Sequence, residues 1–508
     1  MKNYLLGVDI GTTSTKAVLF DREGKVQTQY AVEYPLLTPV PGAAEQKAEE
    51  IYQAVKTSIR KALSASGISS EKLLLVSFSA AMHSLIAIDK DGKPITNSIT
   101  WADQRAEPWV KKLKEEWNGH EIYLRTGTPI HPMSPLAKII WLKHERPRIF
   151  EETYKFISIK EYVLHQLFGE YIVDYSIASA TGLFHLEELD WDKGALEVAG
   201  ITADHLSKLV PTTHKIQGLS KGLAEELGLS IDVPFIIGAN DGVLSNLGVN
   251  GIEPGVVALT IGTSGAIRTM TNKPVTDQKG RTFCYALTND HWVIGGPVNN
   301  GGMVLRWLRD EFCYEEVEKA KELGVDPYDL ITEKISKVKP GSEGLIFHPY
   351  LTGERAPIWN ANARGSFFGL GMHHKREHMM RAVLEGINFN IYTVLLALEE
   401  QIGIPEKIHA TGGFAKSPLW RQMLADVFNQ EVQIPESVES SCLGAVVLGL
   451  YALGEIDDFT IVSKMVGTID NNLPNQQHVK VYKELIPVYL RLSRMFNDEY
   501  PYVVKFQN

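Results

Sequence analysis

Residues 4–20, YLLGVDIGTTSTKAVLF, predict two strands joined by a tight turn. Apolar and β-branched residues flank Gly11, Thr12 and Thr13, which is the pattern of two strands joined by a short turn. A third strand-like stretch, residues 25–32, follows the turn DREG. The sequence therefore predicts a three-stranded antiparallel meander.

The next hundred residues extend this meander into a layered fold. Residues 44–63 place apolar side chains at helical spacing, and residues 73–80, LLLVSFSA, form a buried type of strand. A second hairpin is predicted in residues 84–101, with its turn at Asp91-Gly92. Strands and helices in this order favour an α/β fold in which helices cover a mixed sheet.

The opening pattern occurs a second time. Residues 256–270, VVALTIGTSGAIRTM, again place an Ile-Gly-Thr turn between two apolar strands, half a chain length after the first. This indicates an internal duplication with a boundary near residues 245–253. Two chance turns are the alternative, because motifs of this length recur by accident.

Composition restricts the class of protein. Of 508 residues, 44% are hydrophobic and 22% are charged, which is typical of globular proteins with sizeable cores. The net charge of −10 argues against nucleic acid or an anionic membrane as the main partner. Three cysteines without metal-ligand spacing favour the cytoplasm. The N-terminus lacks the apolar core of a secretory signal. The longest apolar stretch, residues 443–453, is too short to cross a bilayer and predicts a buried helix.

Turns rich in glycine, threonine and serine expose backbone N–H groups that can bind phosphate, and two of them predict a polyphosphate site. Asp9, just before the first turn, could hold Mg²⁺ through water, or could simply end a strand. Lys16, just after it, could reach a phosphate or be an ordinary solvated residue. Neither a Walker A motif nor a protein-kinase motif occurs.

Two longer stretches resemble family signatures. Residues 365–385, with GSFFGL and HMMRAVLE, resemble the C-terminal signature of the FGGY carbohydrate kinases, and MSPLAKIIWLKHE (133–145) resembles the N-terminal one except near His144. The resemblance extends to about residue 455 and implies α/β architecture with duplicated actin-like ATPase (ribonuclease H-like) domains flanking a central cleft. Residues 1–247 would form the N-terminal sugar-binding domain and residues 248–508 the C-terminal nucleotide-binding domain. The remaining tail is predicted to be helical, with no role assigned.

The resemblance also implies residue roles. Asp241, in GANDGVLSNLG, matches the catalytic base that accepts the proton of the acceptor hydroxyl, although aspartate here could also be a helix N-cap. Met82 and His83 match the substrate segment, with Ala81 where the pentulose kinases have glutamine. The substrate-binding residues expected from TWADQRA are Trp101, Asp103 and Arg105.

Arg105 offers a planar fork suited to the carboxylate of a sugar acid, and a salt bridge is its alternative role. The first turn, with its phosphate-binding pattern, predicts nucleotide-binding residues at Gly11, Thr12, Thr13 and Lys16. The resemblance carries further nucleotide-binding positions over to the second half: Gly262, Thr263, Ser264, Gly302, Gly412, Gly413 and Lys416. Lys416 stands where relatives often have a small or polar residue.

The implied function is ATP-dependent phosphorylation of a sugar acid with Mg²⁺. The sequences of residues 34–46, of SFSAAMHSLIAID and of TWADQRAE are most similar to those of the gluconokinase branch. This resemblance implies conversion of D-gluconate to 6-phospho-D-gluconate. Xylulokinase or another sugar or polyol kinase is the alternative, while glycerol kinase is disfavoured because Met82-His83-Ser84 replaces its arginine-glutamate pair. An actin-like filament protein is a further alternative function. Because members of the family are often dimers, the protein could also form a homodimer.

Overall fold

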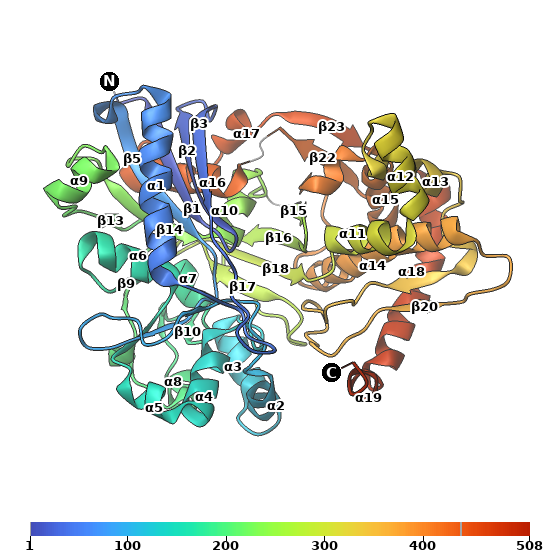
Figure 1. The fold of residues 1–508 in the computed structure, drawn as a ribbon, viewed down its shortest axis with the longest axis horizontal. Helices are drawn as coiled ribbons and strands as arrows, with labels where there is room; N and C mark the ends of the chain where they lie inside the picture. Colours follow the sequence, from blue (N-terminus) through green and yellow to red (C-terminus); the bar gives the residue numbers. More distant parts are fainter. Residues whose placement is uncertain (1, 254, 437–438, 508) are drawn as a thin grey trace. The chain divides into compact units, whose positions relative to one another are not determined.

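The computed structural model describes residues 2–253, 255–436 and 439–507, which form two compact units (Figure 1). Unit 1 contains Met1–Ile252, Met270–Ile294 and Glu439–Gly467. Unit 2 contains Glu253–Thr269, Gly295–Val438 and Thr468–Asn508. The six-stranded sheet lies within unit 1, whereas most strands of the seven-stranded sheet belong to unit 2.

The sheet of unit 1 has six strands in the order β13-β14-β5-β1-β2-β3. The strands β1 and β2 pair antiparallel, as do β2 and β3, so the predicted meander is confirmed. The strands β5 and β14 continue the sheet in parallel with β1, and every residue of β5 is buried. The strand bounds are β1 Tyr4–Ile10, β2 Ser14–Asp21, β3 Val26–Glu33, β5 Leu73–Ala80, β13 Lys215–Ile216 and β14 Phe235–Asn240.

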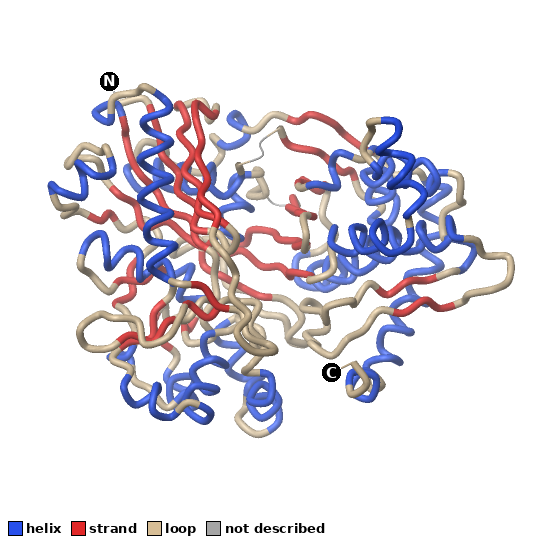
Figure 2. The backbone as a smooth tube through the Cα atoms, viewed as in Figure 1, coloured by secondary structure: helices blue, strands red, loops and turns tan. Residues whose placement is uncertain are grey.

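Helices pack on this sheet along their apolar faces. The predicted first helix is α1 (Ala48–Ser66), which packs against β2 and β3. The helix α16 (Ser440–Leu453) is buried almost throughout and contacts β1, β5, β14 and α10 (Asp241–Gly248), as expected for a helix that is apolar on all sides. Further helices of this unit are labelled in Figure 1 and coloured blue in Figure 2: α2 Glu107–Glu115, α3 Gly119–Thr126, α4 Pro135–Glu145, α5 Pro147–Glu152, α6 Ile159–Phe168, α7 Tyr175–Ser179, α8 Lys193–Ala199, α9 Lys221–Leu227 and α17 Val462–Met465.

The second predicted hairpin forms its turn, but its two arms do not pair as a regular two-stranded ladder. Its turn does form, with Gly92 N–H donating to Asp89 O at 3.1 Å and Gly92 at a φ of 77°. The two arms, however, are joined only by isolated bridges, because β6 (Ile86–Ile88) pairs with β8 (Lys155–Ile157) and β7 (Ser98–Ile99) pairs with β4 (Glu45–Gln46). Short outer strands of this unit also pair locally: β9 Ile172–Asp174 with β12 Lys208–Val210, and β10 Phe184–His185 with β11 Asp190–Trp191.

The second sheet has the order β17-β18-β16-β15-β21-β22-β23. The strands β15 and β16 form an antiparallel hairpin, and β21 and β22 run parallel to β15 on its other side. Unit 1 has the same arrangement of β1, β2, β5 and β14, which supports the predicted internal duplication. The strand bounds are β15 Val256–Ile261, β16 Gly265–Thr271, β17 Phe283–Ala286, β18 Trp292–Val298, β21 Lys407–Thr411, β22 Glu431–Pro435 and β23 Thr468–Asn472. The strands β19 (Ile346–His348) and β20 (Ser366–Phe368) form a separate antiparallel pair.

The core of unit 2 is the helix α14 (Arg376–Ile402). Among the described residues, α14 is the one helix that is long and apolar enough to cross a membrane. However, 83% of its most apolar 18-residue stretch is buried inside the protein. The tail is helical as predicted, since α18 (Gln476–Asn497) buries Tyr482 and Tyr489 in unit 2. The other helices of unit 2 are α11 Gly302–Phe312, α12 Tyr314–Leu323, α13 Pro327–Ser336, α15 Pro418–Phe428 and α19 Tyr500–Val504, with short 3₁₀ turns η3 Ser342–Gly344 and η4 Gly413–Lys416. Unit 1 contains the 3₁₀ turns η1 Ser70–Lys72 and η2 Ala203–His205.

The compact units do not coincide with the two halves of the sequence. The chain returns to unit 1 for residues 439–467, because α16 buries its apolar surface against strands of that unit, and then continues into unit 2. The assignment of sugar to residues 1–247 and of nucleotide to residues 248–508 remains a prediction.

Candidate active site

The candidate site of unit 1 lies at the carboxyl ends of three neighbouring parallel strands. Asp9 on β1 stands opposite Ser79 on β5, and Ser79 stands opposite Ala239 on β14. The segments that follow these strands carry the Gly-Thr-Thr turn, Met82-His83 and Asp241, so the register brings three predicted parts of the site to one sheet edge. Ligands bind at this edge in open α/β sheets.

The turn after β1 is held by side chains from other segments. Gly11 N–H donates to Ser14 O at 3.0 Å, and the indole N–H of Trp101 donates to Thr12 Oγ1 at 3.0 Å. The amide of Gln46 donates to Thr12 O at 2.5 Å. Trp101 therefore lies at the turn. Gln46, on the short strand β4, also contacts the turn, although no role had been expected for it.

Asp9 is tied into unit 1 by two hydroxyls. It accepts hydrogen bonds from Ser79 Oγ at 2.6 Å and from Ser441 Oγ at 2.9 Å. Burial raises the pKa of Asp9, and the serines and the nearby Lys16 ammonium only partly oppose this effect. Lys16 forms an ion pair with Glu439 at 2.9 Å, so a phosphate at Lys16 would compete with a carboxylate.

Asp241 occupies the first turn of α10 but does not cap the helix. The cap is Asn240, whose side-chain oxygen accepts from Val243 N–H at 2.8 Å. The helix-cap alternative for Asp241 is therefore wrong. A carboxylate in this position is stabilised by the positive end of the helix dipole.

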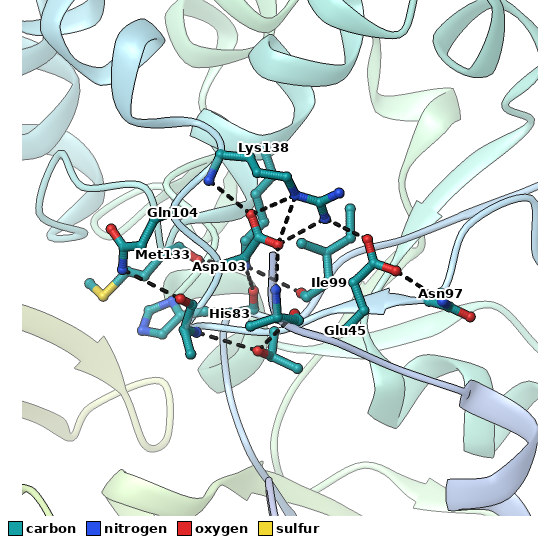
Figure 3. Close-up of polar contacts among 12 residues, drawn as sticks. Glu45, His83, Asn97, Ile99, Asp103, Gln104, Met133 and Lys138 are labelled. Atoms are coloured by element: carbon teal, nitrogen blue, oxygen red, sulfur yellow. Dashed lines mark hydrogen bonds and ion pairs between the residues drawn. The ribbon is translucent and has the colours of Figure 1, made fainter. Parts of the chain in front are cut away.

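His83 adopts an uncommon backbone conformation, with a φ of 68°. Its Nδ1 lies 2.7 Å from Ala180 O, and its Nε2 lies 3.4 Å from Tyr285 Oη. Its carbonyl accepts from the fully buried Lys138, whose ammonium also donates to Ile99 O and Met133 O (Figure 3). Lys138 lies within the MSPLAKIIWLKHE signature, although no role had been expected for it.

Arg105 is occupied by protein carboxylates. Its guanidinium lies 2.6 Å from Glu45 Oε1 and 2.8 Å from Asp103 Oδ2, and it stacks on Trp141 with 4.5 Å to the ring centre. Asp103 is buried and also accepts from Ala44 N–H at 2.9 Å. These contacts favour the salt-bridge alternative for Arg105, in a half-buried form, over recognition of a substrate carboxylate.

Unit 2 contains a cavity of about 390 Å³ around the second turn. Gly302 N–H donates to Gly262 O at 2.7 Å and Met303 N–H to Thr263 O at 3.0 Å, so the start of α11 is bonded to the turn. Among the predicted nucleotide residues, those that line the cavity are Gly262, Thr263, Gly302, Gly413 and Lys416.

The walls of this cavity come from elements without a recognisable motif. Arg306 on α11 and Tyr328, Asp329 and Thr332 on α13 line one part, while Phe414 and Trp420 are among the residues from the segment after β21. Aromatic and polar side chains beside a Gly-Thr turn suit a base, a sugar and phosphates in one ligand. The α13 residues had not been predicted, because nothing in their local sequence marks them.

A buried carboxylate orders the loop before α11. Glu354 accepts from Asn299 N–H at 2.5 Å, from Asn300 Nδ2 at 2.9 Å and from Asn390 Nδ2 at 2.7 Å. Burial raises the pKa of Glu354, and the hydrogen bonds only partly offset this. The group therefore links α14 to the Asn-Asn-Gly-Gly segment and stabilises the position of the cavity's glycines.

Duplicated sheets with a Gly-Thr turn at equivalent strand ends define a protein of the actin-like ATPase class. Residues 4–248 match the N-terminal domain of the FGGY family of carbohydrate kinases, and residues 257–453 match the C-terminal domain. The chain belongs to this family and is a carbohydrate kinase with ATP as co-substrate. The expectation from the two signatures is thereby confirmed.

Known relatives are similar over the whole chain. Gluconokinase of Bacillus subtilis (strain 168) is 57% identical over all 508 residues and 99% of its own length, whereas xylulose kinase of the same strain is 27% identical over 97% of each chain. Solved structures described as gluconate kinase and as ligand-bound xylulose kinase from Lactobacillus acidophilus each superpose with a TM-score of 0.93, at 37% identity and with 98% of this chain and 99% of theirs covered. The predicted fold class is confirmed.

Proposed function

We propose that the chain transfers the γ-phosphoryl group of ATP to D-gluconate and forms 6-phospho-D-gluconate. The observation that carries the proposal is the identity of 57% to a gluconokinase over the full length, against 27% to a xylulose kinase. Phosphorylation of D-xylulose is the second candidate, since the two Lactobacillus acidophilus structures with different described substrates are equally similar.

In this proposal Asp241 is the general base. It follows β14 at the sheet edge, where it would accept the proton of the acceptor hydroxyl as that oxygen attacks the γ-phosphorus. Positioning and charge stabilisation account for most catalysis in phosphoryl transfer, so the geometry of this carboxylate matters more than a large pKa shift.

The acceptor would lie against Met82, His83 and Trp101. The thioether and the indole supply apolar surface for the carbon face of the sugar chain, and the imidazole supplies directional hydrogen bonding. Asp103 and Arg105 follow in the same segment. Because they form an ion pair with each other, we assign them to the support of Trp101 and to the local electrostatic field.

ATP would occupy the cavity of unit 2, with its phosphates at the turn of Gly262, Thr263 and Ser264. The turn at Gly11, Thr12 and Thr13, together with Lys16, would contact the transferring phosphate. Gly412 and Gly413 would permit close approach of the nucleotide to the backbone.

Mg²⁺ is expected with ATP, and Asp9 fits it. No cluster of three acidic, histidine or cysteine side chains suited to a metal occurs among the described residues, so a cation here would keep much of its water and meet a single carboxylate. Burial disfavours the charge of Asp9, and a cation would compensate for it. When bound, the ion would neutralise charge on the phosphates.

We place the reaction in the cytoplasm, where the three free, buried cysteines would remain reduced.

An acceptor panel tests the substrate. ADP release is measured with D-gluconate, D-xylulose, L-ribulose, glycerol and L-fuculose at equal concentrations. We expect kcat/KM for gluconate to exceed the others by at least about 100-fold, since a polar pocket rejects ligands that leave its groups unpaired. Preference for another acceptor would overturn the gluconate assignment and leave the kinase assignment intact.

Asp241→Asn tests the base. The amide keeps the shape of the side chain but does not take the proton, so we expect kcat to fall by about 10³-fold or more while the Kd for ATP stays within about twofold. Single-turnover rates and nucleotide titration measure the two quantities. A variant with near-normal kcat would show that another group is the base.

A further inference from the structure

Lys138 connects three chain segments of unit 1 through one ammonium group. It lies on α4 and is completely buried, and its Nζ donates to His83 O at 2.5 Å, to Met133 O at 2.8 Å and to Ile99 O at 3.3 Å. An ammonium has three N–H donors and no acceptor, so three carbonyls match it in number. Each carbonyl belongs to a different segment.

Two of these segments carry residues that we assign to acceptor binding. The His83 carbonyl belongs to the residue whose imidazole would contact the acceptor, and that residue has a positive φ that needs support from its surroundings. Ile99 lies two residues before Trp101, which donates to Thr12 Oγ1 at 3.0 Å. Lys138 therefore holds both segments without reaching the acceptor itself.

The position is electrostatically expensive, which points away from a general packing role. Burial lowers the pKa of Lys138 to about 7, while the Asp103 carboxylate opposes this change and the Arg105 guanidinium adds to it. An apolar side chain would fill the same volume without a desolvation cost, so the three hydrogen bonds are the property that distinguishes lysine here.

We propose that Lys138 is a positioning residue for the acceptor: its ammonium fixes the spacing between the His83 and Trp101 segments and so determines the affinity for the sugar rather than for the nucleotide. The inference rests on the proposed placement of the acceptor at Met82, His83 and Trp101. It concerns contacts within unit 1, whereas the cavity that we assign to ATP lies in unit 2. The turn of unit 1 that would contact the transferring phosphate keeps its own backbone hydrogen bond, from Gly11 N–H to Ser14 O.

Lys138→Met tests this inference with whichever acceptor the panel identifies, so failure of the gluconate assignment would not be confused with failure here. We expect KM for the acceptor to rise by about tenfold or more while KM for ATP stays within about twofold, because misplaced binding groups weaken only the ligand they contact. Steady-state kinetics with each substrate varied in turn measures both constants.

Lys155→Met is the matched control. Lys155 in β8 also donates to two backbone carbonyls of unit 1, Asp204 O at 2.9 Å and Leu206 O at 2.8 Å, but it supports neither acceptor segment. Its acceptor KM should stay within about twofold of the wild type.

The outcomes against the proposal are distinct. An acceptor KM within about twofold of the wild type in folded Lys138→Met overturns it, and so does an equal rise of both KM values, which indicates a general structural role. If Lys138→Met does not fold, Lys138→Gln, which keeps an N–H donor, is measured against the same thresholds. If neither variant folds, Lys138 serves the fold and the proposal is wrong.

Discussion

Gly412 stands next to the lining residue Gly413 of the unit 2 cavity and closely approaches the backbone of β15. Its φ is 110°, and a Cβ atom built there would lie 2.2 Å from Ile261 O. A backbone oxygen cannot move aside like a flexible side chain, so any residue larger than glycine would push the segment after β21 away from β15. The neighbouring Gly413 has a different environment, since a Cβ atom there meets nothing within 4 Å.

Gly412→Ala should therefore destabilise unit 2 by about 2–3 kcal/mol and raise KM for ATP, because both the strained φ and the contact with Ile261 must be relieved. Thermal unfolding and ATP kinetics measure the two effects. Gly413→Ala serves as the control for stability only, and its melting temperature should match the wild type. Equal melting temperatures for all three proteins would contradict the account.

At the scale of elements, the tail completes unit 2 through the packing of α18 against β19. His348 on β19 is fully buried, lies 3.1 Å from Tyr489 O through Nε2 and stacks on the Tyr489 ring. Burial lowers the pKa of His348 to about 4, which the hydrogen bond to the Tyr489 carbonyl only partly opposes. The role that the sequence left open for the tail is thus structural at this contact.

The contact should make unfolding of the protein depend on pH. The unfolded chain protonates this histidine near pH 6.5 and the folded chain only near pH 4, so the stabilisation is complete above pH 6.5 and is lost as the pH falls towards 4. Between pH 7 and pH 4.5 the loss from His348 should be about 2–3 kcal/mol.

His348→Gln removes the titration while keeping an N–H donor for Tyr489 O. Its unfolding free energy, measured with denaturant at pH 7 and pH 4.5, should fall less than that of the wild type. His120→Gln, at an exposed position, is the control and should follow the wild type. If His348→Gln also follows the wild type, the histidine is not the source of the pH dependence.

At the scale of the whole molecule, each ligand should protect its own set of amides. Hydrogen exchange is measured for the free protein, with an ATP analogue alone and with the best acceptor alone. We expect the analogue to slow exchange most in the turn after β15, at the start of α11 and after β21, and the acceptor to slow it most around His83 and Trp101, because bound ligands suppress local opening where they make contact. Protection of only the first-half segments by the analogue would contradict the assignment of ATP to unit 2.

Local patterns in the sequence were sufficient for much of this description. Alternating or continuous apolar runs predicted the meander, the strand β5 and the buried helix α16, because hydrophobic periodicity is a property of neighbouring residues. The repeated Gly-Thr turn predicted two equivalent sheets, and the two signatures identified the family. The position of Asp241 at a strand end was also readable from its neighbours.

Only the tertiary structure decided which distant side chains meet. It tied Arg105 to Glu45 and Asp103, placed Tyr328 of α13 in the cavity wall, and returned α16 to unit 1. It also showed that Lys138, which the sequence marks only as part of a signature, donates hydrogen bonds to His83 O and to Ile99 O and so links the His83 and Trp101 segments. Such contacts depend on the packing of elements far apart in the chain, where burial makes each unpaired charge or carbonyl costly and so selects its partner.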